Sequence, residues 1–372
     1  MSGNNSGGGE QWAWLGLLKW TLAHQDGTVP SGESPTMMSE EDKAFLEKVM
    51  AEGIIDESER MKFVLQEFSK AMEYYKIKSD SQKAAEERSP PNEDDLEDLL
   101  QELRDIVEQV DFARGFVNMK GCSYLLGAIG AMTTASKPVV PTGIRNNCLG
   151  ILATLAQNNP PVQKELLELG AIKILSELFL LPSSLTPIST KTKIMQALSA
   201  IVRCYDLTEA VFEKLPQAPL LMVQGLSSDP SVSNASLRAK TLFFLRAFLA
   251  SDNGTPARAD IFNHSIAMIA DTDSLYLNNS SSGEAPDVVA IQLRESAIAL
   301  LQQLLERRLA VTLLLQRKQH LASLGVQRIL ELRTAAKGEE AEFTRVELQH
   351  WEEFLAQLAR AEPDEVRIGE SK

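Results

Sequence analysis

Apolar residues recur along this chain every three or four positions, the period of an amphipathic α-helix rather than of a β-strand. The pattern predicts a short helix over residues 12–24 and a longer one from about residue 58 to residue 75. A third begins at Ser39, where a serine followed by acidic residues is typical of a helix start. An acidic amphipathic helix is predicted over Leu96–Val110, and another over Phe343–Leu358.

The central region contains an internal repeat. One template is a basic residue followed by apolar or small residues three, seven and ten positions later. It opens at Arg145, Lys191, Arg238 and Arg294, at intervals of 46, 47 and 56 residues. A spacing this regular indicates structural units of similar size.

A second template has nearly the same period. It places an apolar pair about four residues after a turn residue, at Gly121, Gly170, Gln217, His264 and Gly325, with first intervals of 49, 47 and 47 residues. This period matches HEAT and armadillo units. We therefore predict an all-α fold, an armadillo-repeat right-handed superhelix of about four repeats with capping helices. Gly121 and Gly170 are expected to provide sharp turns at positive φ.

Breaks in the pattern predict the domain organisation. Residues 1–36 form a flexible segment carrying the first short helix, and residues 37–91 hold further helices and a linker that begins near Lys76. The repeat array covers 92–335, and a capping helix with a frayed tail covers 336–372. Within the array, the polar stretch Asp271–Pro286 is expected to be an exposed loop.

Composition narrows the function. The net charge of −14 disfavours nucleic acid and anionic membrane surfaces as partners. Three widely spaced cysteines, Cys122, Cys148 and Cys204, suggest neither a disulfide framework nor a zinc site, and we expect buried thiols. Neither a secretory signal nor an apolar run long enough to span a bilayer is recognisable, so a cytoplasmic location is expected.

The sequence offers no candidate chemistry. Its four histidines lack partners at metal-ligand or nucleophile spacing, and no phosphate-binding or hydrolase motif occurs. Runs of carboxylates are usually solvated helix faces. We therefore expect a protein without catalytic residues, metal or cofactor.

The remaining possibility is that the protein recognises a partner through its surface. The four basic residues that open the first template, called the template cations below, could form a ladder along one edge. Alternatively, they could cap helix ends or pair with acidic residues of adjacent units. A second polar set closes the first long helix and consists of Gln157, Asn158 and Asn159. These amides could line a groove or could satisfy backbone groups at a helix end.

Three motifs in the sequence form a distinctive set. The first is Leu17-Leu18-Lys19-Trp20-Thr21-Leu22-Ala23-His24 followed by Asp26-Gly27-Thr28. The second is Met38-Ser39-Glu40-Glu41-Asp42. The third is Ala156-Gln157-Asn158-Asn159-Pro160 with Gln163. Together they resemble the armadillo-type nucleotide-exchange factors of heat shock protein 70, in particular their cytosolic plant and fungal members, and the resemblance runs from about Trp12 to Leu358. Two departures are the insertion in the array and the replacement of the turn glycine by Gln217 and His264.

The resemblance implies a function. Family members clasp lobe II of the nucleotide-binding domain of heat shock protein 70 and promote ADP release, so we expect a monomeric co-chaperone that uses its concave face. It assigns partner binding to Arg238, within Arg238-Ala239-Lys240, and with less weight to Arg145, Lys191 and Arg294. It also implies a segment that displaces chaperone substrate, including Trp14, Leu17, Leu18 and Trp20, although a packed N-terminal helix would explain the same residues.

Two other classes remain open. An armadillo scaffold could bind extended peptides in its groove, but such grooves carry tryptophans, and all four here lie outside the predicted repeats. An enzyme would need convergent titratable groups, and the sequence shows no such cluster.

Overall fold

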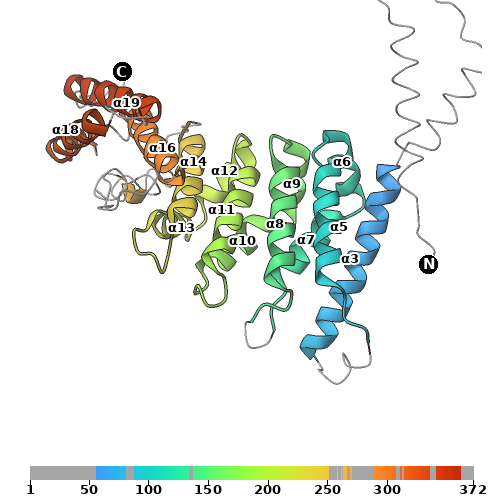
Figure 1. Cartoon of the computed structure of the whole chain (residues 1–372). Helices are drawn as coiled ribbons and strands as arrows, with labels where there is room; N and C mark the ends of the chain where they lie inside the picture. The colour runs from blue at the N-terminus through green and yellow to red at the C-terminus, as the bar shows by residue number, and fades with distance from the viewer. Residues whose placement is uncertain are drawn as a thin grey trace, which may run out of the picture. The chain divides into compact units, whose positions relative to one another are not determined.

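The computed structural model describes residues 56–80, 88–133, 137–250, 288–306, 314–335 and 341–361, with a few positions between 258 and 311. Every named element in these residues is an α-helix, which confirms the predicted all-α class (Figure 1). Contacts divide the chain into two units, residues 1–60 and 61–372, and the helical repeats belong to the second. The helices predicted at residues 12–24 and after Ser39, and the loop Asp271–Pro286, lie outside the described residues.

Three successive repeats each contain two short helices followed by a long one. They are α6 (Val110–Asn118), α7 (Gly121–Gly130) and α8 (Thr142–Ala156); α9 (Pro160–Glu168), α10 (Ala171–Leu180) and α11 (Ile188–Val202); and α12 (Asp206–Glu213), α13 (Ala218–Leu226) and α14 (Ala235–Ala250). The other named helices are α3 (Glu57–Asp80), α5 (Glu93–Ile106), α16 (Val288–Leu305), α18 (Lys318–Ala335) and α19 (Ala341–Arg360). This three-helix arrangement is armadillo-like, and α16 corresponds to the long helix of a fourth repeat.

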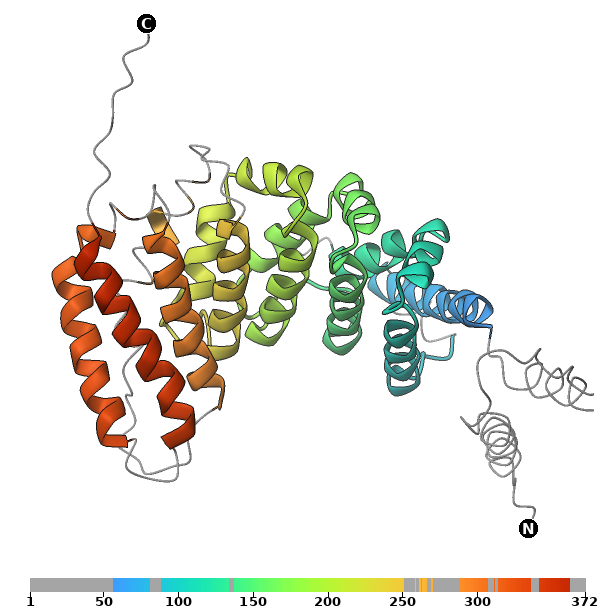
Figure 2. The same ribbon diagram turned by 90° about the horizontal axis from the view of Figure 1, so that it is seen from above.

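The long helices pack side by side in the order of the sequence. α5 contacts α8, α8 contacts α11, and the series continues through α14 and α16 to α19 (Figure 2). The short helices α7, α10 and α13 also contact one another in order. Each repeat therefore buries its apolar surface against its neighbours, as expected of a solenoid.

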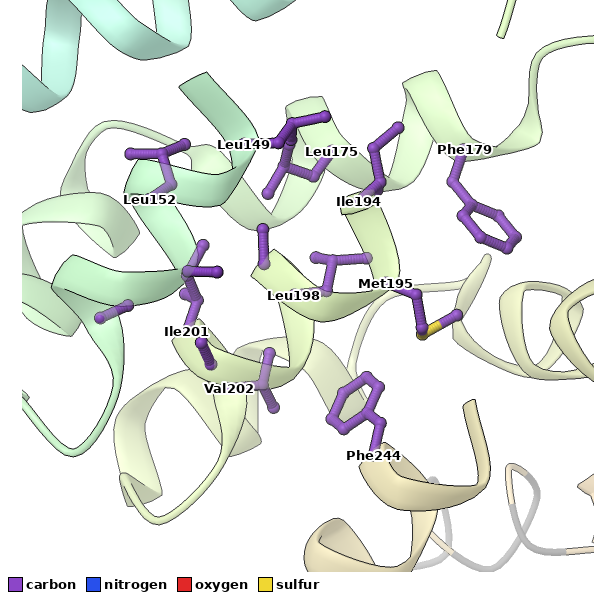
Figure 3. Packing of buried hydrophobic residues seen from close by; sticks show 14 of the residues in the cluster. Leu149, Leu152, Leu175, Phe179, Ile194, Met195, Leu198, Ile201, Val202 and Phe244 are labelled. Carbon is purple, nitrogen blue, oxygen red and sulfur yellow. The ribbon is translucent and has the colours of Figure 1, made fainter. Parts of the chain in front are cut away.

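The core between repeats is mainly aliphatic. Figure 3 shows side chains of α8, α10, α11 and α14 meeting around α11. Those with no more than 1% exposure are Leu149, Leu152, Leu175, Phe179, Ile194, Met195, Leu198, Ile201, Val202 and Phe244. Full burial of a side chain of this size stabilises the fold by about 1.5–3 kcal/mol.

Prolines set the start of several helices. Pro141 and Pro187 immediately precede α8 and α11, and Pro160 is the first residue of α9. The proline ring fixes φ, and the missing N–H costs nothing in the first turn of a helix. Two of the three long helices of these repeats therefore begin directly after a proline.

The turn before the second short helix differs between repeats. Gly170 adopts φ 74°, as predicted. The prediction for Gly121 is wrong in its reason, because Lys120 takes the positive φ of 63°. Gly121 is required by space instead, since a Cβ there would lie 2.3 Å from the Phe116 ring. Gln217 has φ −85°, so the third repeat makes this connection without a left-handed residue.

The C-terminal helices close the array. Trp351, Phe354 and Leu358 of α19 are buried, and α19 packs on α16 and α18. The predicted C-terminal helix is confirmed. At the other end α3 continues to Asp80, so the linker predicted from Lys76 begins too early.

A buried ion network joins these last helices. Glu347 of α19 accepts from Arg328 Nε at 2.7 Å and Nη2 at 3.0 Å, and from Arg294 Nε at 3.3 Å. Burial opposes the charge of Arg328, but the bonds to Glu347 and Glu331 outweigh it and raise the pKa of Arg328. This network fixes α16, α18 and α19 to one another.

Candidate partner-binding face

The predicted ladder of template cations does not form one exposed row. Arg145 and Lys191 are only 2% and 4% exposed, and Arg238 is half-buried. Each lies in the first turn of its long helix, and burial lowers the pKa of all three. Arg294 differs, because it pairs with Glu347. Of the four, Arg238 therefore has the position best suited to contact a partner.

Helical geometry explains why the template selected inward-facing cations. The residues three, seven and ten positions after Arg145 are Cys148, Leu152 and Leu155, and all three are buried. Positions with that spacing share one face of a helix, so the basic residue shares the core face. A residue two positions further along points to a different side of the helix.

Two more accessible cations occupy such neighbouring positions. Lys193 of α11 and Lys240 of α14 each follow a template cation by two positions, and Lys240 is exposed. Burial lowers the pKa of Lys193, and the charges of Arg104 on α5 and of Lys240 lower it further. Lys193 therefore lies within electrostatic range of cations on two other helices, and none of the three pairs with a carboxylate in the described residues.

Arg104 crosses the intervening helix. Its Nε donates to Thr154 Oγ1 of α8 at 3.1 Å, and its guanidinium lies beside Gly150. The arginine therefore extends along α8, the helix between α5 and α11, which explains how charges from α5 and α11 come into range.

An exposed aromatic residue extends this surface. Phe243 is 52% exposed and lies one helical turn after Lys240 on α14. The Arg203 guanidinium is 4.5 Å from the centre of its ring, and Arg203 Nε donates to the carbonyl of Ser199 at 3.0 Å. We call Arg104, Lys193, Arg203, Lys240 and Phe243 the basic face.

The amide motif at the end of α8 forms the turn into α9, and Asn159 precedes that helix without a side-chain cap. Asn158 adopts φ 52°, and Cys204 takes φ 60° at the matching position after α11. Asn159 is buried and begins α9, while Gln157 and Asn158 are exposed. Of the two readings of the amides, an exposed groove position thus remains open only for Gln157 and Asn158.

Gln163 has a defined packing role. Its side-chain nitrogen donates to the carbonyl oxygens of Ala200, Ile201 and Arg203 at 2.9, 3.1 and 2.9 Å. These groups lie at the end of α11, where helix carbonyls lack partners within the helix. Gln163 thereby caps the long helix of its own repeat.

Another buried cation, in the third repeat, forms ion pairs. Arg258 is buried and pairs with Glu209 at 3.0 Å and with Glu213, and its guanidinium lies 4.3 Å from the centre of the Phe248 ring. It therefore stabilises the third repeat.

Two further sequence predictions concern the cysteines and the N-terminal segment. Cys122 and Cys148 are buried, but Cys204 is exposed, so the expectation of three buried thiols is wrong. Trp14, Leu17, Leu18 and Trp20 lie outside the described residues.

Across the described ranges, no group of three or more His, Cys, Asp and Glu side chains could hold a metal ion. No helix among those residues is both long and apolar enough to cross a membrane.

The described residues define an all-α helical-repeat protein with a cationic, partly aromatic surface on its long helices. Comparison with known proteins finds no family model that matches the chain. No curated protein is significantly similar to it either.

Proposed function

We propose that this protein is a co-chaperone that binds the ATPase domain of heat shock protein 70 through the basic face and promotes ADP release. The observation that carries the proposal is the cluster of Arg104, Lys193 and Lys240, cations of α5, α11 and α14 that pair with no carboxylate in the described residues of a chain whose net charge is −14. The identity of the partner rests on the resemblance of the motifs described above.

The cluster favours binding of an acidic surface. Like charges held together destabilise the free protein. A carboxylate of the partner would reduce their repulsion and would form the ion pair that they lack. Arginine and exposed aromatic side chains are also the residue types that dominate protein interfaces. Arg203 and Phe243 provide both beside the cations.

The proposed mechanism requires no catalytic residue. If the protein binds the nucleotide-free ATPase domain more tightly than the ADP-bound form, binding shifts the domain toward nucleotide release. Linkage then requires ADP to weaken binding of this protein by the same factor, and about 1.4 kcal/mol of coupling corresponds to tenfold.

Calorimetric titration of a heat shock protein 70 ATPase domain, with and without ADP, tests the proposal. The variant Lys193→Glu/Lys240→Glu should bind at least about tenfold more weakly than wild type. Its charge-matched control is Lys164→Glu/Lys173→Glu on the short helices α9 and α10, where both lysines are more than half exposed. The control should bind like wild type.

Three results would count against the proposal: no binding, equal loss in both variants, or affinity that ADP does not change. Affinity independent of ADP, together with tight binding of acidic extended peptides, would instead favour the armadillo scaffold. The fully buried Trp351 cannot supply an exposed ladder for such peptides.

A further inference from the structure

A cavity of about 640 Å³ opens where α8 and α11 begin. The end of α3, the segment before α8 and the segment before α11 all contribute to its wall. Its polar and charged lining residues are Tyr75, Lys78, Ser79, Glu93, Thr133, Lys137, Thr142, Arg145 and Ser184. It is distinct from the basic face, none of whose residues lines it.

The charges around the cavity favour an anion. Lys78, Lys137 and Arg145 line it, against a single lining carboxylate, that of Glu93. Burial raises the pKa of the Tyr75 hydroxyl and neighbouring Glu93 raises it further, so the Glu93 carboxylate lies near Tyr75. Lys78 and Lys137 are exposed and form no ion pair in the described residues.

Two helix amino termini add to the positive potential. The residues before α8 and α11 are Pro141 and Pro187, which also line the cavity, and neither helix has a side-chain cap. The free N–H groups of a first turn carry partial positive charge and bind phosphate groups readily.

Arg145 provides the independent observation. It is 2% exposed, and its Nε is buried without a hydrogen-bond partner. A cation in the first turn is opposed by the helix dipole, and no carboxylate in the described residues compensates for it. A buried guanidinium beside an uncapped helix start is unfavourable in an empty site, whereas a bound oxyanion would accept hydrogen bonds from both groups.

We propose that this cavity binds a phosphate group, with Arg145 as its buried donor, Lys78 and Lys137 at its rim, and the first turn of α8 beneath it. The phosphate group can belong to a free phosphate or to a phosphorylated serine of another protein. The proposal does not depend on the proposed co-chaperone function, because it uses a different part of the molecule.

Calorimetric titration of the full chain with inorganic phosphate tests the site, with sodium chloride at equal ionic strength as reference. Wild type should bind phosphate, and Arg145→Met should bind it at least about tenfold more weakly, as expected when a charged donor is lost. The matched control is Lys191→Met, which removes a cation of equal burial and register. Lys191 does not line this cavity, and its Nζ lies 5.5 Å from the centre of the Phe179 ring.

A second variant protects the test against misfolding. Lys137 is exposed, so Lys137→Ala should fold normally and still bind phosphate more weakly than wild type.

A phosphoserine peptide that binds more tightly than inorganic phosphate, while its unphosphorylated form does not bind, would identify a phosphorylated protein as the source. Equal affinity for the phosphoserine peptide and for inorganic phosphate would identify free phosphate as the ligand.

Absence of phosphate binding beyond the chloride reference would overturn the proposal. Unchanged affinity in Arg145→Met would also overturn it, as would equal weakening in Arg145→Met and Lys191→Met. If Arg145→Met does not fold, unchanged affinity in Lys137→Ala decides against the site.

Discussion

The amide of Gln163 is the most informative single contact for the way the helices of one repeat are joined. It is 1% exposed and donates to three carbonyl oxygens at the end of α11, from a position on α9, the first short helix of the same repeat. Replacement by methionine keeps the length of the side chain and removes both N–H donors. Gln163→Met therefore tests the cap with little change in packing volume.

The size of the effect follows from the lost donors. The amide of Gln163 has two N–H donors for three carbonyl acceptors. The substitution therefore removes two strong hydrogen bonds, or the same two donors shared among the three acceptors. A net hydrogen bond contributes about 0.5–1.5 kcal/mol, and a buried group left unpaired costs about 1–3 kcal/mol. We expect Gln163→Met to lower the free energy of unfolding by about 2–4 kcal/mol.

Urea unfolding followed by circular dichroism measures this change. The control is Gln101→Met on α5, which removes an exposed bond to Asp105 and should change stability by less than about 0.5 kcal/mol. A change below about 0.5 kcal/mol for Gln163→Met would refute the capping role.

Gln163→Glu adds a test by pH. Its introduced carboxylate would face carbonyl oxygens, so its pKa in the folded state should be raised above the unfolded value. Such a group destabilises the fold above its folded pKa and loses that effect below its unfolded pKa. The loss of stability should therefore be largest at neutral pH and should shrink as pH falls toward about 4.

The remaining predictions concern other parts of the fold. Glu347→Ala leaves buried Arg328 with only the partly exposed Glu331 as a partner and should cost about 3–5 kcal/mol in urea unfolding, whereas Glu352→Ala, in an exposed pair with Arg333, should cost less than about 1 kcal/mol. Equal losses would contradict the buried network. Gly121→Ala should lower the melting temperature because of Phe116, and Gly127→Ala, with open space around it, should not. A thiol reagent should modify only Cys204 in the native protein, because burial raises the pKa of Cys122 to about 12 and also raises that of Cys148. Native reaction of all three thiols would contradict this.

Periodicity predicted the fold because helices and repeats are encoded by local spacing. The apolar stripe after Arg145 identified the long helix, and Pro160 and Gly170 marked boundaries that their own backbone chemistry requires. The closing helix was equally visible, because Trp351 and Phe354 lie on one face of it.

The candidate site was less accessible to sequence reasoning. A template built on core positions selects cations on the core side, so Arg145 and Lys191 drew attention before Lys193 did. The approach of Arg104 to α11 depends on how α5 packs on α8, which no spacing within one helix reveals. The partners of Gln163 lie at the end of another helix of its repeat, 37 to 40 residues away, and its role was likewise not predictable from local pattern.

The most direct test of the account is stopped-flow release of a fluorescent ADP analogue from a heat shock protein 70. Wild-type protein should accelerate release, Lys193→Glu/Lys240→Glu should lose most of the acceleration, and Arg238→Ala should reduce it. The control Lys164→Glu/Lys173→Glu should match wild type. Unaccelerated release with wild type, or full acceleration by Lys193→Glu/Lys240→Glu, would contradict the proposed use of the basic face.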